Sequence, residues 1–113
     1  MPELPEVEVV RRGLAPRIQG ATVREVRVRE SRLRWPVPAD LADKLAGRTL
    51  KAIDRRGKYL LLDFDSGVLI VHLGMSGTLR WFDHAPPLIA HDHVDLVTDR
   101  GLLRYNDPRR FGA

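Results

Sequence analysis

The first eight residues, MPELPEVE, contain the groups in this chain that are best suited to chemistry. A Met–Pro start is readily trimmed, and removal of Met1 leaves Pro2 with a free secondary amine. A free α-amino group has a pKa of about 8, so a neutral, nucleophilic fraction exists near pH 7. Glu3, adjacent to that amine, can transfer protons, and Glu6, one helical turn further on, can orient the site or a structural water. The opening therefore offers an amine nucleophile together with acid and base groups.

The same opening also suits an ordinary helix start. Pro5 fits the first turn, where its missing N–H is not needed, and the glutamates favour the positive end of the helix dipole. Apolar spacing predicts a helix over residues 4–18, distorted near its end by Pro16 and closed by Gly20. The residues of its apolar face are Val7, Val10, Leu14 and Ile18. Short motifs specify function loosely, so the opening alone leaves both interpretations open.

After this helix the pattern is mostly β. Residues 22–30 alternate as a strand with an arginine-bearing face, and residues 40–46 form a short helix with Asp40 as its cap and Gly47 at its end. Further strands are expected at residues 49–56, 58–65, 68–73, 78–82, 93–98 and 102–107. The fold class is therefore α+β: an antiparallel β-sandwich or flattened barrel with helices at its ends, the N-terminal helix carrying the terminal amine.

Length and composition indicate one small domain over residues 1–113. The hydrophobic fraction of 43% is ordinary for a folded protein. The absence of cysteine excludes disulfides and thiolate zinc or redox sites within these residues. No apolar run reaches membrane-spanning length, and the acidic start does not resemble a signal peptide. We expect a soluble, cytoplasmic protein without a membrane partner.

The charge is positive, and its distribution points to a polyanion. The formal net charge is +4, and 16 of the 19 basic residues are arginine. Basic domains suit nucleic acids because neutralised phosphates release condensed counterions. Arginine richness can equally reflect a GC-rich genome and a solvated surface. Charge alone therefore leaves nucleic-acid binding open.

Four segments, in order along the whole chain, match one protein family. They are MPELPEVE at the start, RRGKYLLL at 55–62, HLGMSG at 72–77 and NDPRRFG at 106–112. Together they resemble formamidopyrimidine-DNA glycosylase, the bacterial enzyme that excises oxidised purines from DNA. The related endonuclease VIII group begins differently after its terminal proline and lacks the pairing of GMSG with DPRRFG. The pairing favours the oxidised-purine branch.

The resemblance implies a bifunctional base-excision repair enzyme, a DNA glycosylase and AP lyase that acts on 8-oxoguanine and formamidopyrimidines. Pro2 corresponds to the nucleophile that forms a Schiff base with the sugar. The resulting iminium is cationic without further protonation and serves as an electron sink for β,δ-elimination. Glu3 corresponds to the proton donor and acceptor, and Glu6 supports the site. Lys58 corresponds to a lysine that contacts a phosphate beside the lesion and donates a proton during elimination.

The resemblance also implies residues that handle damaged double-stranded DNA. Flipping a nucleotide out of a duplex costs a few kcal/mol, and side chains that fill the gap offset part of that cost. Met75 corresponds to the residue that fills the vacated position, Phe111 to the wedge, and Arg109 to the group that hydrogen-bonds the orphan base. Arg110 extends the basic track. His72 resembles a phosphate-contacting histidine, although a hydrogen-bonded histidine at a strand end is the alternative.

His91 and His93, in the sequence HDH, invite a metal interpretation. Strand alternation would place both on one face, but no third ligand is evident. We therefore predict no metal here. The two histidines are interpreted as backbone-ordering or phosphate-proximal groups, with His91 counted among the DNA-binding residues.

Full-length members of the family continue with a helix–two-turn–helix segment and a four-cysteine zinc finger. Neither lies within these 113 residues, so zinc is expected only in that further part and no cofactor in this chain. The domain alone, expected to be a monomer, should bind DNA weakly and excise little, with lyase activity on abasic sites left open. Two other interpretations stay open: a non-catalytic basic DNA-binding module, and a small RNA- or ribosome-associated β-domain.

Overall fold

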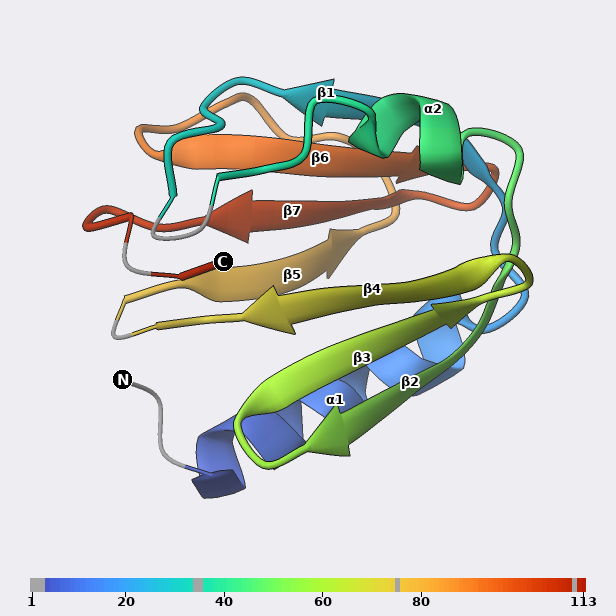
Figure 1. Ribbon diagram of the computed structural model, residues 1–113, viewed down its shortest axis with the longest axis horizontal. Helices are drawn as coiled ribbons and strands as arrows, with labels where there is room; N and C mark the ends of the chain where they lie inside the picture. Colours follow the sequence, from blue (N-terminus) through green and yellow to red (C-terminus); the bar gives the residue numbers. More distant parts are fainter. Residues whose placement is uncertain (1–3, 34–35, 75, 111) are drawn as a thin grey trace.

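The computed structural model of the chain describes residues 4–33, 36–74, 76–110 and 112–113. Its strands are β1 Val23–Val28, β2 Leu50–Arg56, β3 Tyr59–Phe64, β4 Gly67–His72, β5 Thr78–Phe82, β6 Asp92–Thr98 and β7 Leu102–Asn106. They form a four-stranded antiparallel sheet in the order β1-β6-β7-β5 and a three-stranded one in the order β2-β3-β4 (Figure 1). The predicted α+β fold with antiparallel sheets is confirmed.

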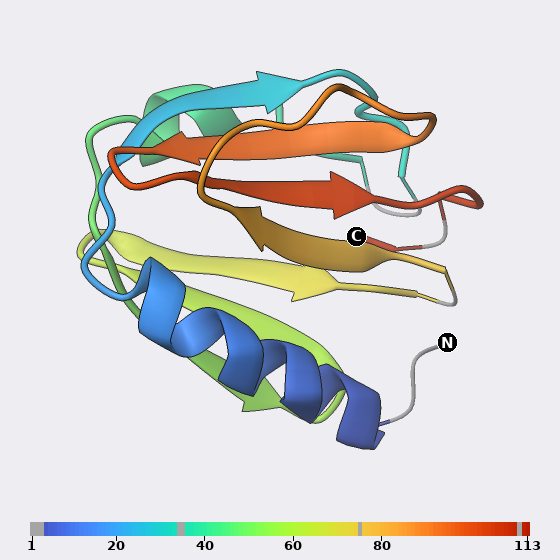
Figure 2. The same ribbon diagram turned by 180° about the vertical axis from the view of Figure 1, so that it is seen from behind.

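Helix α1 (Leu4–Ile18) runs along the three-stranded sheet, chiefly against β2 (Figure 2). Pro16 lies inside its last turn without ending it, and Gly20 follows with a φ of 86°, a left-handed conformation that glycine adopts readily. The buried residues of the helix recur at helical spacing and join the core beneath it. They are Val7, Leu14 and Ile18.

Helix α2 (Leu41–Leu45) is held by packing rather than by its cap. Asp40 occupies the N-cap position as predicted, but its side chain makes no capping hydrogen bond. Its carboxylate instead pairs with Lys44 one turn later, at 3.2 Å. Both end leucines are buried, and the helix contacts β1. The prediction of a capping side chain is therefore wrong, because the carboxylate has a cation within reach. Neither described helix is long and apolar enough to cross a membrane.

A buried ion cluster joins three strands of the larger sheet. The carboxylate of Asp95 on β6 accepts hydrogen bonds from Arg104 on β7 at 2.9 and 3.0 Å, and from Arg29, just after β1, at 2.7 Å. Burial opposes the charge of Asp95, yet the hydrogen bonds from Arg104 and Arg29 keep its pKa below the ordinary value. The cluster therefore lies at the middle of β6 and β7 and holds the end of β1 against them.

The connection between β2 and β3 is a tight turn that exposes a lysine. Arg56 pairs with Tyr59, so Gly57 and Lys58 form a two-residue hairpin loop. Gly57 has a φ of 59°, and glycine at the first loop position is typical of a type II′ turn. The backbone therefore fixes Lys58 at the tip of this hairpin.

Strand pairing brings several turns and loops to one end of the sandwich. Tyr59 pairs with His72, and the backbone of His72 exchanges two hydrogen bonds with Ala113. Asn106 at the end of β7 pairs with Thr78 and with Asp92. We call this side the loop end. It consists of the β2–β3 turn, the 72–78 connection, residues 90–92 and the segment after β7. It faces left in Figure 1, and both ribbon views place the start of α1 on the same side.

Candidate nucleic-acid interface

The start of α1 and the β2–β3 turn carry part of the predicted catalytic set. Glu6 is exposed in the first turns of α1. Lys58 is partly exposed. Among the described residues, Lys44 forms an ion pair, with Asp40, and Lys58 forms none. Pro2 and Glu3 lie outside the described residues. The structure thus brings Glu6 and Lys58 to one end of the molecule and does not test the other two.

His72 ends β4 and is a hydrogen-bonded, half-buried histidine. Its Nδ1 accepts the N–H of Gly74 at 3.1 Å, so in the neutral ring the proton is on Nε2. The ring packs against Tyr59, with 4.9 Å between the centroids. The structure therefore supports the strand-end interpretation of His72. A phosphate contact through Nε2 stays a prediction.

The carboxylate of Asp107 is the centre of the loop end. It is fully buried, and its Oδ1 accepts hydrogen bonds from the Ser76 hydroxyl at 2.5 Å and the Arg109 N–H at 3.2 Å. Its Oδ2 accepts hydrogen bonds from the Tyr105 hydroxyl at 2.7 Å and the Gly112 N–H at 2.9 Å. One side chain therefore joins the 72–78 connection to the segment after β7. These are the two loops in which Met75 and Phe111 occur; both lie outside the described residues.

The hydrogen bonds to Asp107 decide its protonation state. Burial alone would raise its pKa, but the hydrogen bonds from Ser76, Tyr105 and two backbone amides outweigh burial and keep the pKa below the ordinary value. Burial, together with the bond to Asp107, raises the pKa of Tyr105 well above its ordinary value. At neutral pH the pair is therefore a carboxylate that accepts and a phenol that donates.

Two glycines permit close backbone packing at the loop end. A Cβ at Gly112 would collide with the Tyr105 hydroxyl and lie 2.5 Å from the backbone oxygen of His72. A Cβ at Gly77 would collide with the backbone oxygen of Leu73. Glycine at these positions therefore serves close backbone packing.

Two arginines follow β7, and their surroundings differ. Arg109 is exposed, next to the buried Asp107. Arg110 has a φ of 58°, and its guanidinium lies 3.2 Å from the carboxylate of Glu30. His91 is also exposed and has a φ of 70°, and its backbone oxygen accepts the N–H of Asp107 at 3.1 Å. This contact is made by the backbone of His91 and not by its ring, so the predicted role of the His91 side chain stays a prediction.

His93 is a core histidine. It is buried, and its Nε2 lies 2.7 Å from the backbone oxygen of Asp107. His91 precedes β6 in a left-handed conformation, so the two histidines do not alternate along one strand face as predicted, although their rings lie 6.2 Å apart. Among the described residues, no group of three or more His, Asp or Glu side chains could hold a metal ion.

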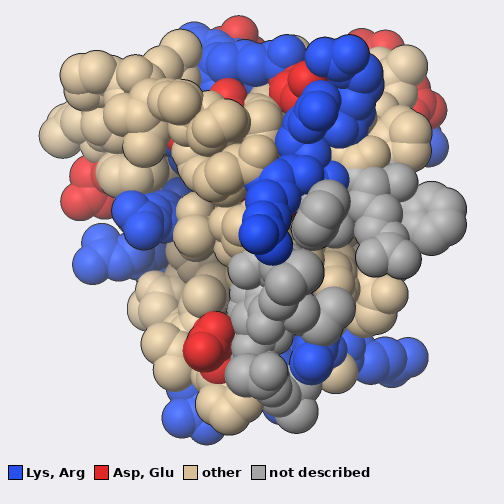
Figure 3. Space-filling view, turned by 90° about the vertical axis from the view of Figure 1, so that its left-hand side faces the viewer, with Lys and Arg blue, Asp and Glu red and all other residues tan. Residues whose placement is uncertain are grey.

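The surface of the loop end is rich in cations. Figure 3 shows blue lysine and arginine side chains across this face, on both sides of atoms that are not described. The basic residues that the strands and turns place there include Arg56, Lys58, Arg109 and Arg110. Positive charge spread in this way suits a phosphate backbone.

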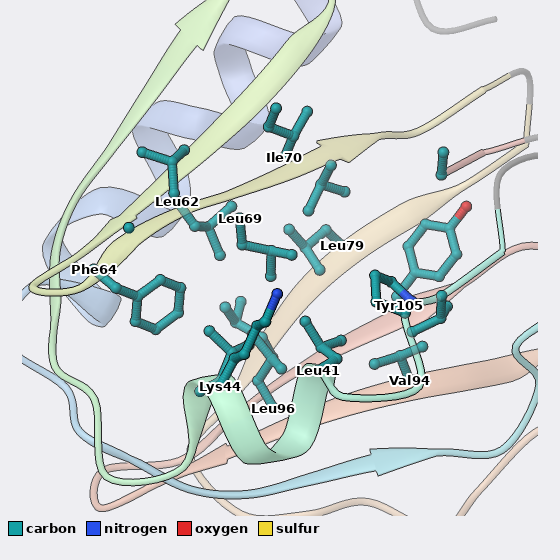
Figure 4. Close-up of a pocket in the computed structure, with 18 of the residues that line it drawn as sticks. Leu41, Lys44, Leu62, Phe64, Leu69, Ile70, Leu79, Val94, Leu96 and Tyr105 are labelled. Carbon is teal, nitrogen blue, oxygen red and sulfur yellow. The ribbon is translucent and has the colours of Figure 1, made fainter.

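A cavity of about 850 Å³ lies between the two sheets, away from most of these groups. Apolar side chains line it, among them Leu62, Phe64 and Leu96, with Lys44 at one side (Figure 4). The ring of Tyr105 forms part of its wall. Because the described residues that line it include no Asp or Glu side chain, we place the candidate site at the loop end.

Sequence reasoning missed the residues that hold this site in place. Ser76 and Asp107 lie inside the GMSG and DPRRFG motifs, but the site residues predicted from these motifs are their neighbours. A small hydroxyl residue between glycines and an acid before proline are the signals that could have marked them. Glu8 and Arg55, which join α1 to the Lys58 turn, are hydrogen-bonded across 47 positions of sequence and carry no local signal.

The comparisons with known proteins show the family of this chain. A family described as the N-terminal domain of formamidopyrimidine-DNA glycosylase matches residues 1–113. The chain belongs to the formamidopyrimidine-DNA glycosylase family. It is 65% identical over its whole length to the formamidopyrimidine-DNA glycosylase of Methylococcus capsulatus and 60% identical to that of Paraburkholderia xenovorans. It spans 42% of the length of each of these relatives.

Solved structures of Lactococcus lactis formamidopyrimidine-DNA glycosylase have the same fold. One is a complex with DNA that contains N7-benzyl-Fapy-dG; it superposes with a TM-score of 0.92 at 39% identity, covering 99% of this chain and 42% of that one. Another is bound non-covalently to DNA with an AP site, with a TM-score of 0.90 at 38% identity, covering 99% and 44%.

The close packing of Gly112 predicts a selective effect of an added methyl group. Gly112→Ala should lower the free energy of unfolding in urea by about 1–3 kcal/mol, because the Cβ meets backbone and hydroxyl oxygens. Gly13→Ala is the matched control: nothing lies within 4 Å of its Cβ in α1, so it should raise the free energy by up to about 1 kcal/mol. Equal effects of the two changes would contradict the packing.

The charge of Asp107 predicts a pH dependence. Its folded pKa lies below the unfolded value of about 3.9, so it contributes stability above that pH, and this contribution is lost as pH falls through the folded pKa. Asp107→Asn should therefore be destabilised by about 1–3 kcal/mol at pH 5–7, with the difference from the parent shrinking below about pH 4. Asp65→Asn, at an exposed turn, should change stability by less than about 0.5 kcal/mol. A difference that persists unchanged at pH 2 would be the contrary result.

Proposed function

We propose that residues 1–113 form the N-terminal catalytic domain of a bifunctional DNA glycosylase and AP lyase of base-excision repair. One observation carries the proposal: in a chain of this family, the fold gathers the start of α1, the Lys58 turn and the two loops joined by Asp107 at one basic end. The named relatives are formamidopyrimidine-DNA glycosylases, and the named structures contain damaged or abasic DNA. The proposed substrates are oxidised purines, 8-oxoguanine and formamidopyrimidines, in double-stranded DNA.

The proposed reaction begins at the amine of Pro2. Its nitrogen lone pair forms a bond to C1′ of the deoxyribose as the glycosidic bond breaks, and the electrons of that bond leave with the base, which takes up a proton. Ring opening gives an iminium; loss of a C2′ proton expels the 3′ phosphate, and a second elimination expels the 5′ phosphate. Glu3 transfers the protons at the sugar, with Glu6 in support. Lys58 binds a phosphate and donates a proton during elimination.

The two loops joined by Asp107 handle the DNA in this proposal. Met75 and Phe111 occupy the space that the flipped nucleotide leaves, and Arg109 hydrogen-bonds the orphan base. The backbone that carries these side chains must be rigid. If the inserted side chains moved with the DNA, they would not offset the free energy lost when the bases unstack. The buried carboxylate of Asp107, with donors from both loops, supplies that rigidity.

Further contacts and parts complete the proposal. His72, His91 and Arg110 contact phosphates on the same face. Zinc belongs to the remaining sequence of the longer family members, outside the residues present here, and the domain alone binds and excises weakly. As a repair domain with bacterial relatives, the protein acts on the chromosome in the cytoplasm.

The test is reductive trapping with sodium borohydride on a duplex that contains an abasic site. Residues 1–113 replace the corresponding 42% of the Methylococcus capsulatus relative, so the rest of the enzyme is present. Protein with Met1 removed should give a covalent adduct. Protein with an N-terminal extension, in which the nitrogen of Pro2 is an amide, should give none. Lys58→Gln should slow trapping at least about tenfold, whereas Lys44→Gln, on α2, should not.

Other results of the trapping experiment would favour one of the alternative functions. Salt-sensitive binding to duplex DNA without any adduct would favour the non-catalytic DNA-binding module over the enzyme. A preference for RNA, with no effect of the N-terminal extension, would favour the RNA-associated β-domain. Adduct formation that is equal with and without the extension would place the nucleophile elsewhere in the protein.

A further inference from the structure

The carboxylate of Glu8, on α1, accepts hydrogen bonds from three arginines. Glu8 Oε1 accepts hydrogen bonds from Arg11 Nε at 2.8 Å and Arg55 Nε at 3.0 Å. Its Oε2 accepts hydrogen bonds from the Arg11 Nη2 group and Arg12 Nε, both at 2.7 Å. Hydrogen bonds from Arg11, Arg55 and Arg12 hold the pKa of Glu8 well below its ordinary range. Glu8 is therefore charged throughout the neutral range, and the three guanidinium groups are held at one point.

Arg55 extends this contact to the turn that carries Lys58. While its Nε donates to Glu8, its Nη1 donates to the backbone oxygen of Gly57 at 3.0 Å. Gly57 is the residue directly before Lys58 in the two-residue loop. The rigid, planar guanidinium thus joins Glu8 on α1 to the backbone of the turn, with a fixed spacing between its two donors.

The contact lies where the proposed reaction needs precision. Glu8 is one helical turn from Leu4, the first residue of α1, and Pro2 and Glu3 directly precede that helix in sequence. Both ribbon views place the start of α1 beside the β2–β3 turn. The direction of α1 and the position of the turn together set the separation between the N-terminal end and Lys58.

We infer that Glu8 is a positioning residue, which through Arg55 fixes the Lys58 turn against the start of α1. The inference rests on the proposed function, in which the terminal amine and Lys58 act on one deoxyribose and its phosphate. The contact need not contribute much stability, because both side chains are partly exposed and solvent screens their attraction. Its effect is on geometry, and a displacement of about 1 Å can slow a reaction about a hundredfold.

The first test measures single-turnover trapping at saturating abasic DNA, in the same hybrid enzyme. Glu8→Ala and Arg55→Ala should each lower the rate constant about 10- to 100-fold with an unchanged reaction amplitude. The double variant should be no slower than the singles, because both lose the same contact. Glu25→Ala is the matched control: it removes the Glu25–Arg27 pair on β1, and its rate should stay at that of the parent.

Arg55→Lys separates positioning from a direct phosphate contact. Lysine keeps the charge, but its single nitrogen cannot reproduce the two-donor link from Glu8 to Gly57. We expect Arg55→Lys to react as slowly as Arg55→Ala. Recovery of the parent rate by lysine would overturn the inference, as would a Glu8→Ala enzyme that reacts at the parent rate or loses only amplitude.

A second readout does not depend on activity. This readout uses residues 1–113 by themselves, which contain no cysteine, so Val9→Cys on the exposed side of α1 can carry a single nitroxide label. Paramagnetic broadening of the Lys58 amide should be strong in the parent and at least about twofold weaker in Glu8→Ala. If no protein forms an adduct but the broadening changes, the proposed function fails and the positioning contact stands. Unchanged broadening overturns the inference whatever the activity.

Discussion

The loop end depends on a single buried charge. Asp107 has no exposed surface, and a carboxylate in that position is stable only when its oxygens are hydrogen-bonded. Ser76, Tyr105 and the amides of Arg109 and Gly112 meet this requirement. Because these donors come from different loops, the hydrogen bonds that stabilise this one carboxylate also hold the two loops in fixed positions relative to each other. The loops proposed to enter the DNA are therefore held by buried hydrogen bonds rather than by solvent-exposed contacts.

Much of the fold follows from the sequence. The helix over Leu4–Ile18 was predictable because its apolar spacing and its early proline agree. The strands were predictable because short β-branched and leucine-rich runs alternate with glycine turns, as at Gly57. The identity of the family was predictable as well, since its motifs span the whole chain and the family match covers residues 1–113. Local patterns of this kind need no knowledge of long-range contacts.

The remaining features depend on tertiary contacts that leave no local pattern. Nothing around Glu8 indicates that Arg55 will reach it across the helix–sheet contact. Asp40 has the sequence of a cap, but Lys44 competes for its carboxylate. His93 follows His91 at strand spacing, yet β6 begins between them, so one becomes buried and the other exposed. In each case the side chain's role is decided by a partner that the alternation of residues does not reveal.

The most direct measurement is to locate the covalent bond itself. After borohydride reduction of a reaction with abasic DNA, nuclease and protease digestion leaves a sugar remnant on one peptide, and tandem mass spectrometry identifies the modified nitrogen. We expect the remnant on the α-nitrogen of Pro2, in peptides that begin at that residue. A remnant on a lysine side chain, such as that of Lys58, or the absence of any modified peptide, would contradict it.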